Sequence, residues 1–206
     1  MVDEAAGVAG FAQLTVHPRR RTCWFWAAVR PTEGPYVLCR DLELGPPHDP
    51  LEIRGQGLWA HLICETAGEH WTVAMEAFAL ELDPPEEAWA GERGTRIGLA
   101  FDLEWESTDE VLPAEADGVT SYRVEGVVNG GLQLGDRSLL ISGHGARTHA
   151  WGRLDPTWWY RYRTAYAPPG DLGGSTAPWA IDLPDGLTVL AERRLVGSDG
   201  VLHWAP

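Results

Sequence analysis

Apolar and polar residues alternate along most of this chain, and the clearest alternation lies in residues 96–106. Every second position there carries a large apolar residue: Ile97, Leu99, Phe101, Leu103 and Trp105. Such strict alternation predicts a strand with one buried and one solvent-facing side, because successive side chains of a strand point to opposite faces. On a helix the same side chains would scatter around the axis. We therefore expect all five to point inward.

A second long strand is predicted over residues 70–82, where both faces carry apolar side chains and a central place in a sheet is expected. Further strands are predicted at 23–29, 35–42, 57–65, 119–128, 131–134, 138–142, 158–166, 186–195 and 200–204. Gly135-Asp136 is typical of a tight hairpin turn. Residues 84–89, which begin with two prolines, predict one helical turn, and residues 1–15 are expected to be a loosely ordered N-terminal segment.

Many short strands separated by clusters of Pro, Gly and Asp indicate an all-β fold, an antiparallel barrel or sandwich. No linker divides the chain and no internal repeat is visible, so we expect a single domain over residues 1–206. A chain of 206 residues can bury roughly 70% of its unfolded surface. It therefore needs no disulfide or metal to hold its core together.

The charge and the cysteines narrow the range of functions. A net charge of −14 argues against nucleic-acid binding, and Arg19-Arg20-Arg21 is expected to be a solvated turn. Cys23, Cys39 and Cys64 form no CxxC pair, so we expect three free, mostly buried thiols in a reducing compartment. No secretory signal and no apolar run of membrane-spanning length is present. We expect a soluble cytoplasmic protein without a membrane partner.

The densest candidate chemistry lies between Gly143 and Gly152, followed by an aromatic run at 158–162. If residues 148–152 are extended, His149 and Trp151 share one face. An imidazole beside an indole suits general acid–base work on an apolar substrate, because the imidazole exchanges a proton near neutral pH and the indole stabilises a developing cation. The alternative is a buried His149 bonded to a backbone carbonyl, with Trp151 filling the core.

Two further candidates carry weaker signals. Glu76 shares a strand face with Phe78 and Leu80, which suggests a partly buried carboxylate with a raised pKa, and the alternative is a salt bridge to an arginine. His144 and His149 have no third ligand at a recognisable spacing, so no metal site is expected. Cys64 and His70 lack the support that a Cys–His nucleophile needs.

Several segments resemble an uncharacterised family of bacterial proteins that is distantly similar to the carotenoid hydratase (CrtC-like) and AttH-like lipocalin superfamily. The matching segments are Gly57-Leu58-Trp59-Ala60, Glu69 to Phe78, Leu103-Glu104-Trp105-Glu106, and the block Gly143 to Gly152 with Trp158-Trp159 after it. In that superfamily an Asp-His-x-Trp-Gly block lines a pocket between lipocalin-like barrels. Known members hydrate or cyclise isoprenoids, and some catalyse pericyclic cyclisations of polyketides.

The resemblance maps that block onto His149, Trp151 and Gly152 and departs from it at Thr148, where relatives carry Asp. Asp182 is the downstream acid that could replace the missing carboxylate. The chain is also shorter than relatives that carry two full β modules. The resemblance implies a lipocalin-like form of the barrel or sandwich.

We therefore expect a protein that binds a hydrophobic polyketide- or isoprenoid-like molecule, with cofactor-free cyclisation or hydration as the implied activity. The catalytic candidates are His149, Asp182 and Glu76. Arg147 would anchor a polar end of the ligand or a neighbouring carboxylate. The ligand-binding candidates are Trp151, Arg147, His144, Trp158, Trp159 and Tyr160. The alternatives are a non-catalytic carrier and a structural or oligomeric β protein, for instance a homodimer.

Overall fold

The computed structural model describes residues 1–18, 21–48, 51–82, 94–116 and 119–152, and four short C-terminal strands. These residues form strands, turns and bends but no helix, which confirms the all-β prediction. The strands are β1 (Val2–Asp3), β2 (Val8–His17), β3 (Thr22–Pro31), β4 (Tyr36–Leu44), β5 (Leu51–Gly55), β6 (Leu58–Thr66), β7 (His70–Leu82), β8 (Thr95–Ser107), β9 (Ala114–Ala116), β10 (Val119–Leu134), β11 (Arg137–Gly152), β12 (Ala180–Asp182), β13 (Thr188–Leu190), β14 (Arg194–Val196) and β15 (Leu202–Trp204).

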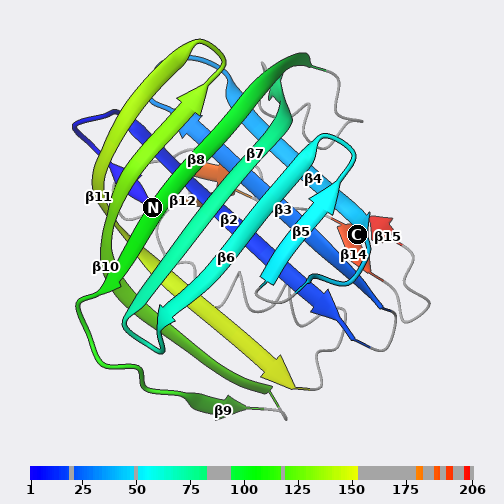
Figure 1. Cartoon of the computed structure of the whole chain (residues 1–206), viewed down its shortest axis with the longest axis vertical. Coiled ribbons are helices and arrows are strands. Elements are labelled where there is room, and N and C mark those ends of the chain that lie inside the picture. The colour runs from blue at the N-terminus through cyan, green and yellow to red at the C-terminus, as the bar shows by residue number, and fades with distance from the viewer. Residues whose placement is uncertain are drawn as a thin grey trace. The chain divides into compact units, whose positions relative to one another are not determined.

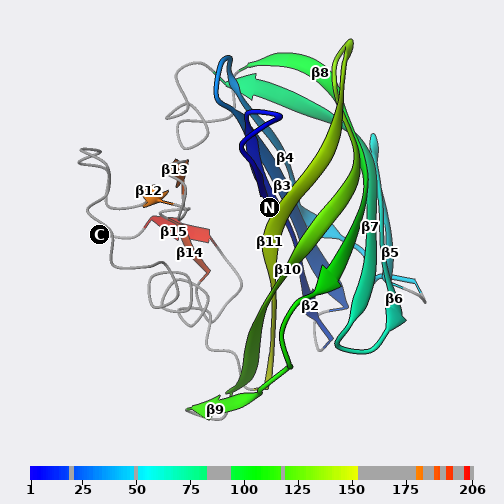
Figure 2. The same ribbon diagram turned by 90° about the vertical axis from the view of Figure 1, so that its left-hand side faces the viewer.

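The main sheet closes on itself as a ring of eight strands. Its strands follow one another in the order β4-β3-β2-β1-β11-β10-β8-β7, and β7 in turn pairs with β4. The β6–β5 hairpin extends from β7, and β9 pairs with β10. Figure 1 shows β6, β7 and β8 crossing in front of β2, β3 and β4, and Figure 2 shows the same two groups from the side. This arrangement fits the predicted antiparallel barrel or sandwich.

The alternation in residues 96–106 places side chains as predicted. Leu99, Phe101 and Trp105 are buried, Ile97 and Leu103 are half-buried, and the acidic residues between them are exposed. The predicted strand 70–82 lies centrally, because β7 pairs with β8 on one side and with β6 and β4 on the other. β3 and β4 are buried on both faces over most of their length.

The hairpin at Gly135-Asp136 is confirmed, since β10 ends at Leu134 and β11 begins at Arg137. Gly135 has a φ of 56°, a conformation that glycine adopts without steric cost. The strands predicted at 119–128 and 131–134 form one continuous strand, β10. Gly130 permits this continuity, because a Cβ there would lie 2.1 Å from the carbonyl oxygen of Asp102 on β8.

The N-terminal prediction was wrong, because residues 1–15 are part of the ring. β2 pairs with β3 along its whole length, and Val2, Val8 and Ala9 are buried. β1 bridges β2 and β11 through the pair Val2↔His144. Small residues such as Ala9 and Gly10 dilute the apolar alternation here, so the strand forms through pairing with β3 more than through its own pattern.

The chain divides into two compact units. The first holds Met1–Val111 and Val124–Arg147, including the ring, and the second holds Leu112–Arg123 and Thr148–Pro206. In the second unit β12 pairs with β13, and β14 pairs with β15. β13 and the start of β14 lie in the predicted strand 186–195, β15 lies in the predicted strand 200–204, and β12 was not predicted. The predicted helical turn at 84–89 and strand at 158–166 lie outside the described residues. No helix in the described part of the chain is long and apolar enough to cross a membrane.

Candidate functional site

The inner face of the ring is apolar, and at one end it stays partly exposed to solvent. Register places Leu51, Leu62, Val73 and Leu103 side by side on the inner faces of β5, β6, β7 and β8. Leu51 is 38% exposed and the other three are half-buried, whereas Ile53 and Met75, further along the same faces, are sealed. The apolar face of these four strands is therefore partly exposed to solvent at the end where β7 begins.

The opposite wall of the ring opens at the same end. β2 runs antiparallel to β3 and parallel to β4, so its last residues lie at the end where β7 begins. Ala12, Leu14 and Val16 share a face with the fully buried Phe25 and its neighbours on β3, yet Val16 is 38% exposed and Ala12 is also exposed. We call this region, where β2 ends and β7 begins, the open end.

A cation and two indoles lie on the inner face near the open end. The guanidinium carbon of Arg147 is 3.9 Å from the centroid of the Trp71 ring. Trp71 lies directly opposite Trp105 across the β7–β8 pair. The indole N–H of Trp105 donates a hydrogen bond to the carbonyl oxygen of Gly145 on β11 (2.9 Å). The indole nitrogen of Trp71 is shielded from solvent and has no hydrogen-bond partner among the residues that the structure describes.

Glycines make these close approaches possible. A Cβ on Gly126 would lie 2.5 Å from the indole nitrogen of Trp105, so the Trp105 ring occupies the space that a side chain on β10 would fill. On β11, a Cβ on Gly143 would lie 2.1 Å from the carbonyl oxygen of Val2, and one on Gly145 would lie 2.8 Å from Cα of Met1. Only glycine therefore fits at positions 143 and 145, where the N-terminal backbone lies against β11.

A second aromatic group lies in the other unit and contains His149. Its imidazole centroid is 4.9 Å from the Trp151 ring and 5.6 Å from the Tyr122 ring, in an edge-to-face arrangement with Tyr122. Tyr122 and Trp151 are 6.1 Å apart. The shared face predicted for His149 and Trp151 is thus confirmed. Both side chains are exposed, so the alternative of a buried His149 with Trp151 in the core is wrong for this structure.

His144 is exposed on β11 opposite Val2, beside a buried acid that the sequence did not indicate. The Asp3 carboxylate accepts the backbone N–H of Ala6 (2.9 Å) and that of Ser142 (2.7 Å). These hydrogen bonds, with a smaller contribution from the charge of His144, hold the pKa of Asp3 below its usual range. Asp3 thereby ties the N-terminal turn to β11.

The burial expected for Glu76 is not found. Glu76 is exposed and Phe78 on the same face is 59% exposed, so this face of β7 is the outer one. Phe78 packs instead against Gly57 and under Arg96, whose guanidinium carbon is 4.9 Å from its ring centroid. Asp182 is the last residue of β12, opposite Thr188. Trp158, Trp159 and Tyr160 lie outside the described residues.

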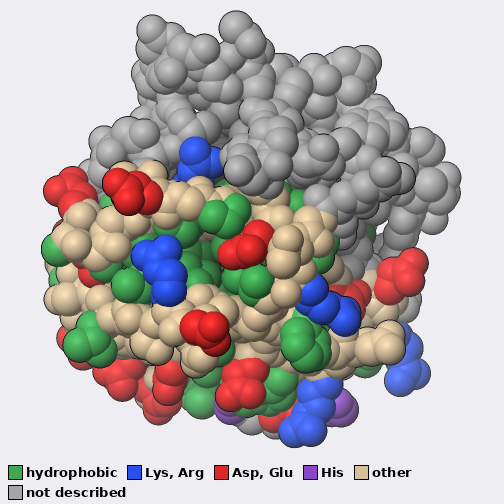
Figure 3. Space-filling view, turned by 90° about the horizontal axis from the view of Figure 1, so that it is seen from above, with side chains coloured by type: hydrophobic (Ala, Val, Ile, Leu, Met, Phe, Trp, Pro, Cys, Tyr) green, Lys and Arg blue, Asp and Glu red, His purple; other side chains and the backbone are tan. Residues whose placement is uncertain are grey.

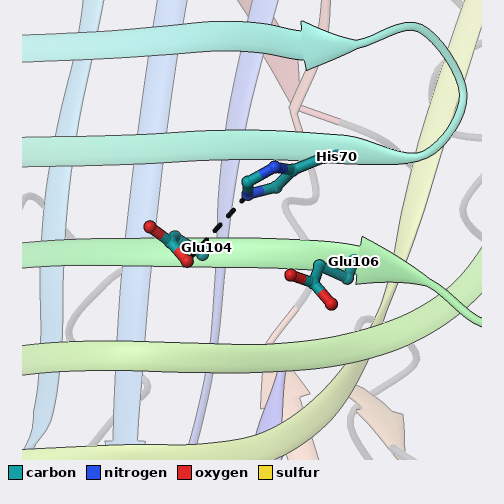
Figure 4. A group of neighbouring side chains, drawn as sticks. All are labelled: His70, Glu104 and Glu106. Atoms are coloured by element: carbon teal, nitrogen blue, oxygen red, sulfur yellow. Dashed lines mark ion pairs between the residues drawn. The ribbon is translucent and has the colours of Figure 1, made fainter.

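Three side chains on the outer face could chemically serve as metal ligands. His70 on β7 lies opposite Glu106 on β8, and Glu104 follows on the same face (Figure 4). Nε2 of His70 is 4.0 Å from a carboxylate oxygen of Glu104, and the ligand atoms of the three residues lie within 4.8 Å of one another. Both glutamates are exposed. In the described part of the chain the group is a half-buried histidine at ion-pair distance from one exposed acid, with a second exposed acid beside it.

The cysteines are free, as predicted, but they are not all buried. Cys23 and Cys39 are buried and Cys64 is exposed. The Cys23 thiol donates to the carbonyl oxygen of Gly45 (2.9 Å), and burial raises its pKa. Cys64 lies opposite Trp71 at the open end, where the β6–β7 register shifts before Thr66. Its exposure follows from the same opening that exposes the inner wall.

The charged residues are concentrated away from the inner face. On β8 the acids Asp102, Glu104 and Glu106 are exposed on the outer face, opposite in direction to Phe101 and Trp105. Seen from above, apolar side chains show between charged ones, and acidic side chains stand along the rim (Figure 3). The net charge of −14 is therefore no barrier to an apolar interior.

The family described as a domain of unknown function, DUF7064, matches residues 1–183 of the chain. The chain belongs to this family. No curated protein and no solved structure matches it. The DUF7064 match begins at β1 and reaches past β12, so it takes in both Arg147 and His149. The resemblance of this DUF7064 chain to the carotenoid hydratase and AttH-like lipocalin superfamily stays a prediction.

Proposed function

We propose that this protein binds a hydrophobic small molecule, of polyketide- or isoprenoid-like character, inside the ring of strands. The observation that carries the proposal is the inner wall at the open end, where Leu51, Leu62, Val73 and Leu103 are apolar and yet accessible. Apolar side chains of a purely structural barrel would be expected to seal this end. A ligand that covers them would remove apolar surface from water at roughly 25 cal/mol per Å².

The binding test uses all-trans-retinol as an uncharged isoprenoid probe and follows quenching of tryptophan fluorescence. Saturable one-to-one quenching is expected. Val73→Asn places an amide on the inner wall and should weaken binding roughly five- to tenfold, because the amide loses water without gaining a partner. Leu140→Asn is the matched control, because Leu140 is 88% exposed, and it should leave the affinity unchanged.

Circular dichroism and thermal melting establish that both variants fold. A native mass spectrum of the purified protein would also reveal a co-purified lipid-like mass. Quenching by retinol that does not saturate, or equal loss of affinity in both variants, would contradict the proposal.

The second candidate function is cofactor-free cyclisation or hydration of a polyketide- or isoprenoid-like molecule at the aromatic group of Tyr122, His149 and Trp151, with His149 as acid–base group. It is supported by the imidazole of His149 lying beside two aromatic rings, whose faces would stabilise a developing cation on a substrate. The three thiols form no disulfide in the structure, which supports a cytoplasmic location for the protein as part of this proposal.

The catalytic test incubates the protein with geranylgeraniol and separates the products by liquid chromatography and mass spectrometry. Hydration adds the mass of one water, and cyclisation changes retention at constant mass. His149→Ala should lower turnover by roughly 10²–10⁴-fold with little change in affinity. His48→Ala is the control, since His48 is an exposed histidine outside the aromatic group. Binding without turnover in the wild type would leave the carrier function in place.

A further inference from the structure

We propose that His70, Glu104 and Glu106 form a binding site for one divalent transition-metal ion, and that Zn²⁺ is the ion that suits it best. The three residues meet because β7 pairs with β8, and they lie on the outer face where β7 begins. The site is separate from the apolar inner face on which ligand binding was proposed. Figure 4 shows the imidazole directed across to β8, where both carboxylates stand.

Strand pairing determines where the three side chains start. His70 is directly opposite Glu106 across the β7–β8 pair, and Glu104 is two residues away on the same face of β8. Side chains at directly opposed positions lie close together, and long side chains at diagonal positions also reach one another. Since β7 and β8 pair without interruption from His70 to Glu81, their backbones hold the three ligands at a fixed spacing.

The imidazole of His70 comes near the glutamates but forms no hydrogen bond with them. Its Nε2 atom is shielded from solvent and has no hydrogen-bond partner among the residues that the structure describes. The facing carboxylate oxygen of Glu104 is 4.0 Å away, beyond the roughly 2.7–3.2 Å of an N–H···O hydrogen bond. Because shielded polar atoms in proteins are nearly always paired, this nitrogen indicates a partner that bridges it to the carboxylates.

The charges at the site match a divalent cation. The ligand atoms of His70, Glu104 and Glu106 all lie within 4.8 Å of one another, so two carboxylates stand close together. Within the described ranges of the chain, His70 is the one ion-pair partner printed by the geometry for either glutamate, and it reaches Glu104 alone. An uncharged imidazole would leave both negative charges uncompensated, whereas one divalent ion balances both of them.

The donor atoms select the kind of ion. Imidazole nitrogen suits Zn²⁺ and related transition-metal ions, whereas Mg²⁺ and Ca²⁺ prefer oxygen ligands throughout. Around a tetrahedral Zn²⁺ ion, at about 2.0–2.2 Å from each ligand, the ligand atoms lie roughly 3.3–3.5 Å apart. Both glutamates are exposed, so their side chains can make the remaining movement of about 1 Å without disturbing the sheet. Three protein ligands leave a fourth position for water.

The experiment titrates ZnCl₂ into the untagged protein, after treatment with a chelator, by isothermal titration calorimetry. One Zn²⁺ per chain is expected, and MgCl₂ should bind at least about tenfold more weakly. His70→Ala should weaken Zn²⁺ binding at least about tenfold, and Glu106→Gln should weaken it several-fold, because each removes one ligand. The matched controls His48→Ala and Glu33→Gln, at an exposed histidine and an exposed acid elsewhere, should leave the affinity unchanged.

Thermal melting gives a second readout. An ion that joins β7 to β8 in the folded state should raise the melting temperature by roughly 5–10 °C at a zinc concentration of about 100 times Kd. His70→Ala should lose this rise. Wild-type protein that binds no Zn²⁺, or equal loss of affinity in the site and control variants, would overturn the proposal. Glu106→Gln changes only an exposed side chain, so it decides the question even where His70→Ala fails to fold.

Discussion

Asp3 should stabilise the protein through its charge, and replacing it tests how the N-terminal strand is held in the ring. The carboxylate is 4% exposed and accepts two backbone N–H groups, from Ala6 and from Ser142. At roughly 1–1.5 kcal/mol for each of the two hydrogen bonds, Asp3→Ala should lower the free energy of unfolding by about 2–3 kcal/mol. For a chain of this size that corresponds to a fall in melting temperature of roughly 5–10 °C. Asp3→Asn keeps one acceptor oxygen, so its melting temperature should lie between those of the wild type and Asp3→Ala.

The pH dependence of this stability difference tests the role of the Asp3 charge more sharply than its size at one pH. Because the folded pKa of Asp3 lies below its usual 3.8, its contribution is complete above the unfolded pKa and disappears as the pH falls through the folded value. Melting curves of wild type and Asp3→Asn should therefore differ by a constant amount above the usual pKa of 3.8, and should converge only as the pH falls from there through the lower folded pKa. Glu4→Gln, an exposed acid in the same turn, is the matched control. A difference that is constant from neutral to acid pH would refute the reasoning.

Two further predictions concern the interior. Trp105→Phe removes the hydrogen bond to Gly145 and should lower the free energy of unfolding, measured in urea, by about 1–2 kcal/mol. The control Trp59→Phe, on the outer side of β6, should lower it by less. Equal losses in the two variants would contradict a stabilising role of the Trp105–Gly145 hydrogen bond. A thiol reagent should label Cys64 quickly in the folded protein, because Cys64 is exposed, and should label the buried Cys23 and Cys39 only after denaturation. Rapid labelling of all three thiols in the folded protein would contradict the burial of Cys23 and Cys39.

The sequence predicted those parts of the fold in which the alternation of apolar and polar residues within one strand identifies its buried face. In β8 the alternation is strong enough to place Leu99, Phe101 and Trp105 without reference to any partner. In β2 one face carries the small residues Gly10 and Ala12 beside larger apolar ones, and the other face mixes Phe11 with polar residues. The strand therefore becomes visible only through its pairing with β3. β5 was missed for a similar reason, since a five-residue strand carries little periodicity.

The candidate site was predictable where spacing within one strand determines it. His149 and Trp151 share a face because they are two residues apart on β11. Arg147 on β11 contacts Trp71 on β7, and the two strands are far apart in the sequence. Neither local sequence pattern indicates that these two side chains meet. The error at Glu76 came from equating an apolar residue with a buried face. Phe78 is apolar but lies outside, supported by Gly57 and Arg96.

The bridge that β1 makes between β2 and β11 has a consequence for how the chain folds. Most strand pairs of the sheet join neighbours in sequence, such as β2 with β3 or β7 with β8, and can form as local hairpins. The hydrogen bond from Ser142 to Asp3 spans 139 residues. Loop-closure entropy must be overcome before so distant a contact contributes, so ring closure should be a late and slow step. During synthesis on the ribosome β11 must be completed before β1 can pair with it, and until then the second edge of β1 stays open to pairing with other chains.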